Sequence, residues 1–448
     1  MKKLVLSAMA IAALSTSAMA EAVAPTLKIS GNTIMNAYAV NQKVKNNGKS
    51  RAHHFSNDIS DLFFLVAGRT ASGIEYKYKI NMQANSNVSP TIAQNYIEFN
   101  TKAGTFQFGN VVGPEDAMIE DAGAIVGGAG AFDGGYKNVY NFSSFALRGN
   151  DNIGDTGYAT KLVYYTPELW NFRFGVAYTP QTSHLGDAKL DNNSIQGNGN
   201  VPGNRNFFPA LPGNVDAYGV RSWAFGLSFK KEVGNWGFNL NGTYLTDISY
   251  LSNTLSPNGG PYARVDDRVS QFGGKIRLRN TSAYQLGTIV AYRLSNGHLV
   301  QVGGGWLDNG HSRNFRRTTY FGTNLVAGAA GDANSGNLHQ GDSGQAWNAG
   351  VGYTMGAYKF AASYQHMERE TDAVRKAKTD VWSLTGDVVP VAGLKFFGEV
   401  DFIRTKSNAV AQTMEQSFNN AFGRVNANSG SNAKNQAAVF IIGSKISF

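Results

Sequence analysis

The sequence predicts an all-β fold, a transmembrane antiparallel up-and-down β-barrel of about 16 strands. Three observations carry this prediction: an aromatic residue ends the 448-residue chain, many segments alternate apolar and polar residues, and short connectors alternate with long ones. A strand buried in lipid must pair all of its backbone polar groups with neighbours, so strands cross a membrane only as closed barrels. Each outward residue then faces lipid and each inward residue faces the lumen, which gives a period of two.

The last strand, expected over 436–448, gives the first indication. Its apolar residues Phe440, Ile442, Ile446 and Phe448 fall on one face. A soluble protein has no reason to end on an exposed Phe, whereas an outer-membrane barrel closes with a strand whose apolar face meets lipid. We expect these four residues to form the lipid-facing edge that acts as the assembly signal.

Residues 1–20 have the pattern of a Sec-type signal peptide. Lys2 and Lys3 precede an apolar run from Leu4 to Leu14, and small residues lead up to Ala20. The run is too short for a transmembrane helix. We therefore expect export, cleavage after Ala20, and one barrel domain over 21–448.

The composition agrees with a barrel and excludes several kinds of chemistry. Charged residues make up 16% of the chain, aromatic residues 12%, and there is no Cys. Charged residues are scarcer than in soluble domains. The missing thiols exclude a disulfide framework, a zinc–thiolate site and a cysteine nucleophile. The 52 glycines are spread through the expected strands rather than gathered in a linker.

The charge balance is basic without pointing to nucleic acid. Loss of Lys2 and Lys3 with the signal peptide lowers the 40 basic residues to 38, against 31 acidic ones. The Lys and Arg residues are dispersed and form no basic run. We expect charge on the surface and in the lumen, and no nucleic-acid partner.

The clearest alternation lies at 74–82, where Ile74, Tyr76, Tyr78, Ile80 and Met82 alternate with polar residues. Nine such residues can cross a bilayer as one tilted strand. Sixteen strands are predicted on this basis: 26–40, 58–69, 73–84, 91–101, 104–112, 157–167, 169–180, 217–231, 235–247, 283–294, 298–308, 345–355, 357–367, 379–389, 393–404 and 436–448.

The connectors between these strands alternate in length. Short ones include 70–72, 295–297 and 390–392, and long ones include 113–156, 181–216 and 405–435. Short periplasmic turns and long external loops are typical of outer-membrane barrels. Two segments fit less well: 85–90 is short for an external loop, and 268–280 could form an extra hairpin.

The connector after the fifth strand carries five acidic residues and neither Lys nor Arg up to Tyr136. They are Glu115, Asp116, Glu120, Asp121 and Asp133. Such a cluster can set the electric field where a pore is narrowest. Five like charges can equally well repel one another into water on an external loop. The local sequence leaves both interpretations open.

Taken together, the signal peptide, the strands, the terminal Phe and this loop make the chain resemble the general trimeric porins of Gram-negative bacteria, of the proteobacterial type. Residues 162–168, Leu-Val-Tyr-Tyr-Thr-Pro-Glu, followed by a strand from Asn171 to Tyr178, look like the sixth strand, turn and seventh strand of that family. The resemblance implies a homotrimer in outer-membrane lipid, insertion by the barrel-assembly machinery, and a third external loop, here 113–156, folded into the lumen as the constriction. The short 85–90 segment puts in doubt the family's second-loop latch to a neighbouring subunit.

The family also places basic side chains on the wall opposite that loop. The alternation points Lys28, Lys77, Lys79 and Arg173 inward, because a charge on the lipid side would cost about 2–4 kcal/mol at mid-bilayer. Arg69 follows a stretch that is apolar on both faces, so its direction is open. Since these basic residues and the acidic residues of the loop oppose one another, we expect weak ion selectivity. It should lean toward anions only because the mature chain, with 38 basic and 31 acidic residues, carries a net charge of +7.

Catalytic and metal-binding patterns are weak. Gly48-Lys49-Ser50 lacks the leading glycine of a phosphate-binding loop, His53 and His54 are adjacent and poorly spaced for one metal ion, and neither G-x-S-x-G nor an EF-hand spacing is found. We expect no enzyme activity, no cofactor and no metal site.

The sequence therefore predicts an outer-membrane porin, a water-filled channel through which small hydrophilic solutes and ions diffuse passively. The alternatives are a channel selective for a sugar, phosphate or organic acid, a secreted β-structured adhesin without a lipid-facing band, and an outer-membrane lipase.

Overall fold

The computed structural model describes residues 22–43, 52–84, 91–130, 132, 135–140, 156–182, 217–251, 280–310, 312, 344–370, 376–407 and 434–448. The expected signal peptide, Asp133, and the segments 85–90 and 268–280 lie outside these residues. The expectations about them therefore stay predictions.

The described residues form sixteen strands, as the sequence predicts. The strands are β1 Val23–Gln42, β2 His53–Arg69, β3 Glu75–Gln83, β4 Thr91–Thr101, β5 Gly104–Asn110, β6 Thr160–Tyr165, β7 Phe172–Gln181, β8 Ala217–Val233, β9 Trp236–Leu251, β10 Thr281–Arg293, β11 Leu299–Asp308, β12 Gln345–Met355, β13 Tyr358–Glu370, β14 Lys376–Val391, β15 Leu394–Ser407 and β16 Lys434–Ser447.

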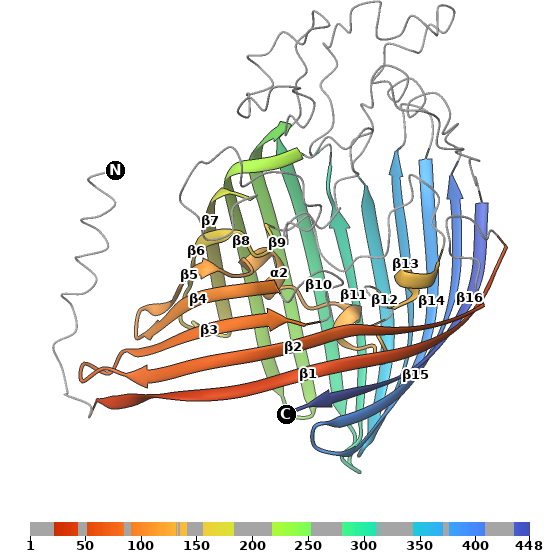
Figure 1. Cartoon of the computed structure of the whole chain (residues 1–448), viewed down its shortest axis with the longest axis horizontal. Helices are drawn as coiled ribbons and strands as arrows, with labels where there is room; N and C mark the ends of the chain where they lie inside the picture. Colours follow the sequence, from red (N-terminus) through yellow and green to blue (C-terminus); the bar gives the residue numbers. More distant parts are fainter. Residues whose placement is uncertain are drawn as a thin grey trace, which may run out of the picture.

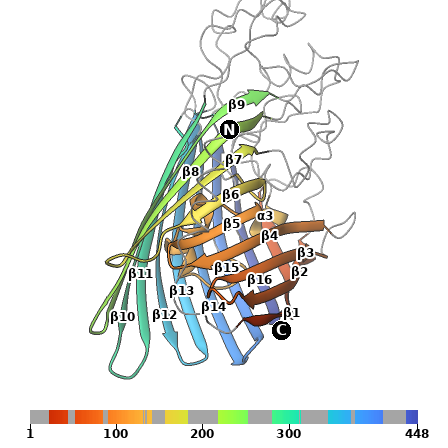
Figure 2. The same ribbon diagram turned by 90° about the vertical axis from the view of Figure 1, so that its left-hand side faces the viewer.

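The sheet is a closed barrel in which each strand pairs with its neighbours in sequence and β1 pairs with β16. Every pairing is antiparallel, as in the seam pair Val40 and Val439. In Figure 1, β1 to β5 cross the near side of the barrel at a steep angle to β9 to β14, and Figure 2 shows the same wall turned by 90°. Closure matters because it leaves no strand edge unpaired.

The two faces of the sheet follow the predicted alternation. In β14, for example, Val381, Ser383 and Thr385 are buried, whereas Trp382 and Leu384 are exposed. The exposed face carries large apolar side chains around the barrel, and polar side chains alternate with them on the other face. The barrel thus presents an apolar outer surface, as a lipid-facing barrel requires.

The chain terminus lies at the seam between β1 and β16. Gly31 and Phe448 exchange two backbone hydrogen bonds of 2.9 and 3.0 Å. A Cβ added at Gly31 would come within 2.7 Å of the Phe448 ring, so the ring lies directly over this glycine. Phe440, Ile442, Ile446 and Phe448 are all exposed on the outer face.

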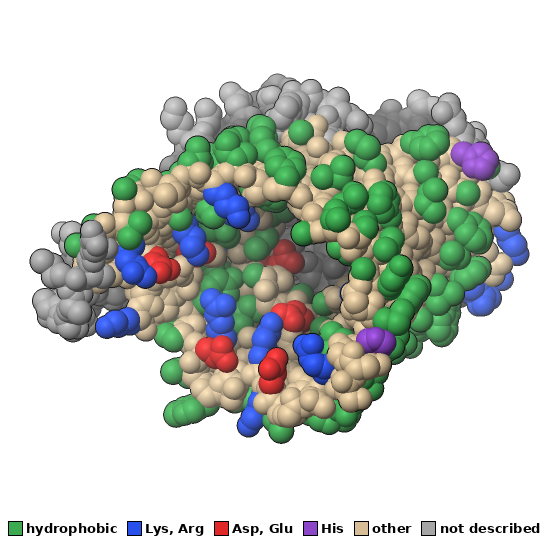
Figure 3. Space-filling model, turned by 90° about the horizontal axis from the view of Figure 1, so that it is seen from below, with side chains coloured by type: hydrophobic (Ala, Val, Ile, Leu, Met, Phe, Trp, Pro, Cys, Tyr) green, Lys and Arg blue, Asp and Glu red, His purple; other side chains and the backbone are tan. Residues whose placement is uncertain are grey.

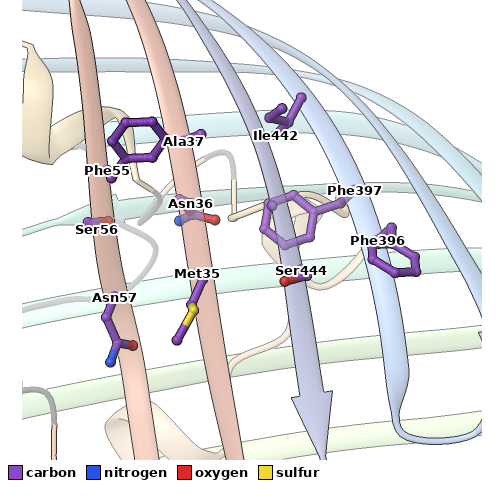
Figure 4. Close-up of a pocket in the computed structure, with 11 residues that line it drawn as sticks. Met35, Asn36, Ala37, Phe55, Ser56, Asn57, Phe396, Phe397, Ile442 and Ser444 are labelled. Atoms are coloured by element: carbon purple, nitrogen blue, oxygen red, sulfur yellow. The ribbon is translucent and has the colours of Figure 1, made fainter.

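Beside this seam an open groove of about 690 Å³ runs across β1, β2, β15 and β16. Figure 4 shows Met35, Phe55, Phe396 and Ile442 around it. Gly443 also lines it, and a Cβ added there would meet Asn36 and Phe397, both buried, at 2.3 Å.

Strand bounds differ modestly from the predicted ones. β2 begins at His53 rather than at 58, because residues 53–57 continue to pair with β1 beyond a bulge at Ile34 and Met35. β6 is shorter than predicted, since its pairing with β5 ends at Thr160. Among the described residues, no helix has the length and apolar character to cross a membrane.

Candidate functional site

In its described residues, the segment that follows β5 contains three short helices, α2 Pro114–Ala117, η1 Ala122–Ala124 and α3 Tyr136–Val139. Pro114 occupies the first helical position of α2, where its missing N–H costs nothing. Asp121 caps η1 by accepting a hydrogen bond of 2.7 Å from the Gly123 N–H. Local sequence thus accounts for the start of the first two helices.

Two buried charged side chains lie where the start of this segment, near Val111, meets its end, near Gly157. We call this place the neck. The Lys161 ammonium donates to the carbonyls of Val111 and Gly157, one on each side of the neck. Glu115 is 0% exposed, and its Oε1 accepts hydrogen bonds of 3.0 and 2.5 Å from the N–H and hydroxyl of Thr156. The two ends of the segment are thereby tied together beside β6.

From the neck the segment contacts the wall in strand order. Met118 lies against β7 and β8, since a Cβ at Gly175 or Gly226 would approach its sulfur to 2.6 or 2.7 Å. The Glu120 carboxylate accepts hydrogen bonds from Lys230 of β8 and Asn239 of β9, and its carbonyl accepts one of 2.7 Å from Asn241. Asp121 then accepts a hydrogen bond of 2.7 Å from Asn348 of β12.

Glycines of the wall make room for this segment. A Cβ at Gly303 or Gly352 would come within 2.6 or 2.5 Å of the Ile125 side chain, and one at Gly305 within 2.6 Å of Asp121. Ile125 is fully buried. We call Gly175, Gly226, Gly287, Gly303, Gly305, Gly350 and Gly352 the glycine track. It runs over β7, β8, β10, β11 and β12, so the wall is shaped to receive the segment.

The tip of the segment, residues 127–129, is held by acidic side chains of β14 and β15. The backbone N–H of Gly128 donates to Asp387 and that of Ala129 to Glu399, both at 2.7 Å. The Gly128 carbonyl accepts a hydrogen bond of 3.2 Å from Lys395. Successive N–H groups aimed at carboxylates are a strong, charge-assisted arrangement.

The part of the segment that contains α3 contacts β1 and β2. Asn138 donates to Asp58 at 2.9 Å, and Asp58 also accepts a hydrogen bond of 2.6 Å from Tyr38. The Val139 carbonyl accepts a hydrogen bond of 3.0 Å from Gln42. Residues 114–140 thus have contacts on strands from β7 around to β2.

The acidic residues singled out from the sequence lie in different environments. Glu115 and Asp121 are buried, at 0% and 3% exposure, and burial raises the pKa of the Asp121 carboxyl. Glu120 forms an ion pair with Lys230, and Asp116 is half-buried. The wall provides these acids with amide, hydroxyl and ammonium donors that a linear sequence does not reveal. That the acids set the electric field of a constriction stays a prediction.

The basic residues lie on the polar face of β1, β3 and β7. Lys28 and Arg173 are exposed, and the Arg173 guanidinium lies 4.8 Å from the centroid of the Tyr165 ring. Lys77 forms an ion pair of 2.9 Å with Glu98. The Lys79 ammonium lies 5.2 and 6.0 Å from the ring centroids of Phe63 and Tyr96. Figure 3 shows basic and acidic side chains around a central hollow.

The side chains of the wall that hold the segment were not predicted from the sequence. Asp58, Lys161, Asp387, Lys395 and Glu399 were not singled out. The available signal was in β15, where Glu399 and Asp401 alternate with the exposed Phe402 and so belong to the buried face. An acidic residue on the inner face of a strand needs a partner, and here the partner is a distant backbone.

Comparison with known proteins identifies the class. Residues 7–408 match the family model described as Gram-negative porin. Since the match spans most of the sequence, the chain belongs to this family of outer-membrane diffusion channels, which are not enzymes. No curated protein matches the chain.

Solved structures agree with the fold. The anion-selective porin from Comamonas acidovorans has 11% identity and a TM-score of 0.51, with 95% of this chain and 100% of that one covered. A loop L8 deletion mutant of OmpT, an outer membrane protein of Vibrio cholerae, has 12% identity, the same coverage and a TM-score of 0.51. This protein is therefore a sixteen-stranded Gram-negative porin. In the part of the chain that the structure describes, no cluster of side chains could hold a metal ion.

Proposed function

We propose that residues 113–140 form the constriction of the channel and that the channel prefers anions. The observation that carries this proposal is a difference in exposure between acidic residues of the segment and basic residues of the wall. Glu115 and Asp121 are buried in hydrogen bonds to the protein, whereas Lys28 and Arg173 are exposed on the polar face. Only charge that reaches the water of the lumen acts strongly on a passing ion.

The contacts of the segment support its place inside the barrel. Its hydrogen bonds go to side chains of β8, β9, β12, β14, β15 and β2. In a closed barrel, a segment that leaves β5 reaches all of these polar side chains by running along the inner wall. The free passage then lies between this segment and the basic wall of β1 to β3.

Cysteine accessibility tests the constriction. The chain contains no Cys, so Ala124→Cys adds one thiol at an exposed position of η1. Treatment with a bulky charged thiol reagent should reduce the single-channel conductance. Ser72→Cys, in the exposed β2–β3 turn, should react equally without any change. An unchanged conductance in labelled Ala124→Cys would place the constriction elsewhere.

Reversal potentials test the preference for anions. Neutralising Lys28, Lys77, Lys79 and Arg173 to Gln should move the reversal potential in a KCl gradient toward cation preference, and the effect should shrink at high salt. Glu115→Gln together with Asp121→Asn should leave it nearly unchanged. A larger shift in the acidic double variant would mean that the acids control the field.

A channel selective for phosphate or an organic acid is the second candidate. The register places Lys28 and Lys79 on either side of Leu65 in one row, which is the beginning of a basic ladder. Such a ladder would bind a polyvalent anion as well as attract it. Concentration-dependent block of chloride current by inorganic phosphate would favour this candidate over a general pore.

We further propose a homotrimer that is exported by the residue 1–20 signal peptide. Membership of the porin family and the resemblance to trimeric porins support the trimer. The charged start and short apolar run support the signal peptide. Native mass spectrometry of the protein extracted from outer membranes should give three copies per particle, and N-terminal sequencing should begin at Glu21.

A further inference from the structure

A patch of basic side chains lies on the outer face of β14, β15 and β16. It consists of Lys376, Lys378, Arg404, Lys406 and Lys434, which we call the outer basic patch. Residues between them, such as Ala377, Thr379, Ile403 and Asn435, are buried on the opposite face. The alternation of the strands therefore directs all five cations outward, away from the lumen and the proposed constriction.

The register places like charges directly against one another. Lys378 pairs with Lys406, and Lys406 pairs with Lys434. Directly opposed residues have Cα atoms only about 4.5–5.5 Å apart. Like charges in this position destabilise a sheet, so three lysines in one row on neighbouring strands need a compensating anion.

The described residues supply only part of that compensation. Glu368 of β13 forms ion pairs of 3.3 Å with Lys376 and 2.9 Å with Lys378. Asp380 lies opposite Arg404 and accepts hydrogen bonds of 2.7 Å from Tyr364 and His366. Among the described side chains, none of the acids forms an ion pair with Lys406 or Lys434. Among the side chains that the structure describes, five cations thus face two carboxylates, and the unbalanced cations lie on β15 and β16.

The patch lies at the level of the membrane interface. Two residues beyond Arg404, and four beyond Lys378 and Lys406, an aromatic row lies on the same outer face. It consists of Tyr364, Trp382 and Phe402, and the first two rings are 4.2 Å apart. Aromatic rows of this kind mark the boundary between lipid tails and headgroups. The cations lie beyond this row, at the end of the barrel where the long connector 408–433 joins β15 to β16. Long connectors face the outside in outer-membrane barrels.

We propose that the outer basic patch binds a phosphate-bearing lipid headgroup of the external leaflet. Lys378, Lys406 and Lys434 would contact one phosphate row as point charges, and Arg404 would offer its planar fork from the row below. The headgroup anion supplies the missing negative charge between the opposed lysines. The barrel is thereby anchored to its lipid along β14 to β16, a role separate from conduction.

Binding of a defined lipid tests this site. The full-length protein in neutral detergent is titrated with a diphosphorylated glucosamine-disaccharide lipid, and bound copies are counted by native mass spectrometry. Lys406→Gln with Lys434→Gln should weaken binding by roughly 30-fold, since each cation near an anionic lipid surface contributes about a factor of five. The matched control removes Lys102 and Lys231, two exposed lysines at the opposite end of the barrel. It carries the same change of charge and should bind as the wild type does.

Two further measurements test whether the phosphate groups are what the patch binds and whether the variants stay folded. The same lipid without its phosphates should bind wild type and double variant equally weakly. Heat-modifiable mobility and single-channel conductance should be unchanged in both variants, which shows that the barrel is intact. Equal weakening in the control pair would overturn the proposal, and so would wild-type binding of the dephosphorylated lipid as tight as that of the phosphorylated one. So would absence of binding to the wild type, because another anion must then neutralise the lysines.

Discussion

Gly127 and Gly128 allow the tip of the segment after β5 to approach the wall. A Cβ at Gly127 would lie 2.4 Å from Asp387, and one at Gly128 would lie 2.2 Å from Glu399. Gly128 also has a φ of +68°, which an L side chain adopts only at a cost. Glycine is therefore required here both for space and for backbone conformation.

Replacement of Gly128 by Ala should displace the tip and change the single-channel conductance. The new Cβ would push against a carboxylate that already accepts the Ala129 N–H. Gly234→Ala is the matched control, because its φ is +58° but nothing lies within 4 Å of an added Cβ. The control should lose only the backbone term, about 1–2 kcal/mol, with normal conductance. Equal conductance in the two variants would mean that the tip does not shape the passage.

The alternation of β3 separates the two faces of the wall at the scale of one strand. Tyr78 is exposed on the outer face, whereas Lys77 reaches Glu98 on the polar face. Glu98 also accepts hydrogen bonds from Asn100 and Gln107, so it keeps partners if Lys77 is lost. Neighbouring positions of one strand should therefore respond oppositely to a change of charge.

Tyr78→Arg should destabilise the folded barrel by about 2–4 kcal/mol if the residue lies near the midplane, because it places a charge in lipid. Lys77→Gln should fold as the wild type does and reduce the preference for anions. Urea titration in lipid vesicles and reversal potentials measure the two effects. Equal stability of both variants would reverse the assignment of faces.

The glycine track shows why the strands could be predicted from the sequence but not the way in which they accommodate the segment after β5. Alternation of apolar and polar residues predicted where the strands lie and how many there are, and the alternating lengths of the connectors predicted their direction. A glycine on an inner face carries no such signal, so Gly303 and Gly352 looked like ordinary strand residues. Glycine is needed at these positions because of Ile125, which is distant in sequence and lies against them only in the folded barrel.

Closure at the seam concerns the whole molecule. Phe448 joins β1 through two backbone hydrogen bonds to Gly31 and covers that glycine with its ring. Deletion of Phe448 should reduce outer-membrane insertion, because it removes the last pairing of the seam and an aromatic end that the barrel-assembly machinery would recognise. Phe448→Tyr should insert normally, since it keeps the ring. Quantitative blotting of outer-membrane fractions measures this, and normal levels of the truncated chain would contradict the prediction.

The sequence by itself determined the barrel, its sixteen strands, the apolar outer face and the terminal aromatic residue. These properties depend on local alternation, which lipid on one side and water on the other impose on every strand. The tertiary structure alone decided which charges are free. Glu115 and Asp121 carry the same charge as any exposed acid, yet Thr156 and Asn348, far away in sequence, bury them in hydrogen bonds. Lys378, Lys406 and Lys434 likewise form a row only because the register of three strands aligns them.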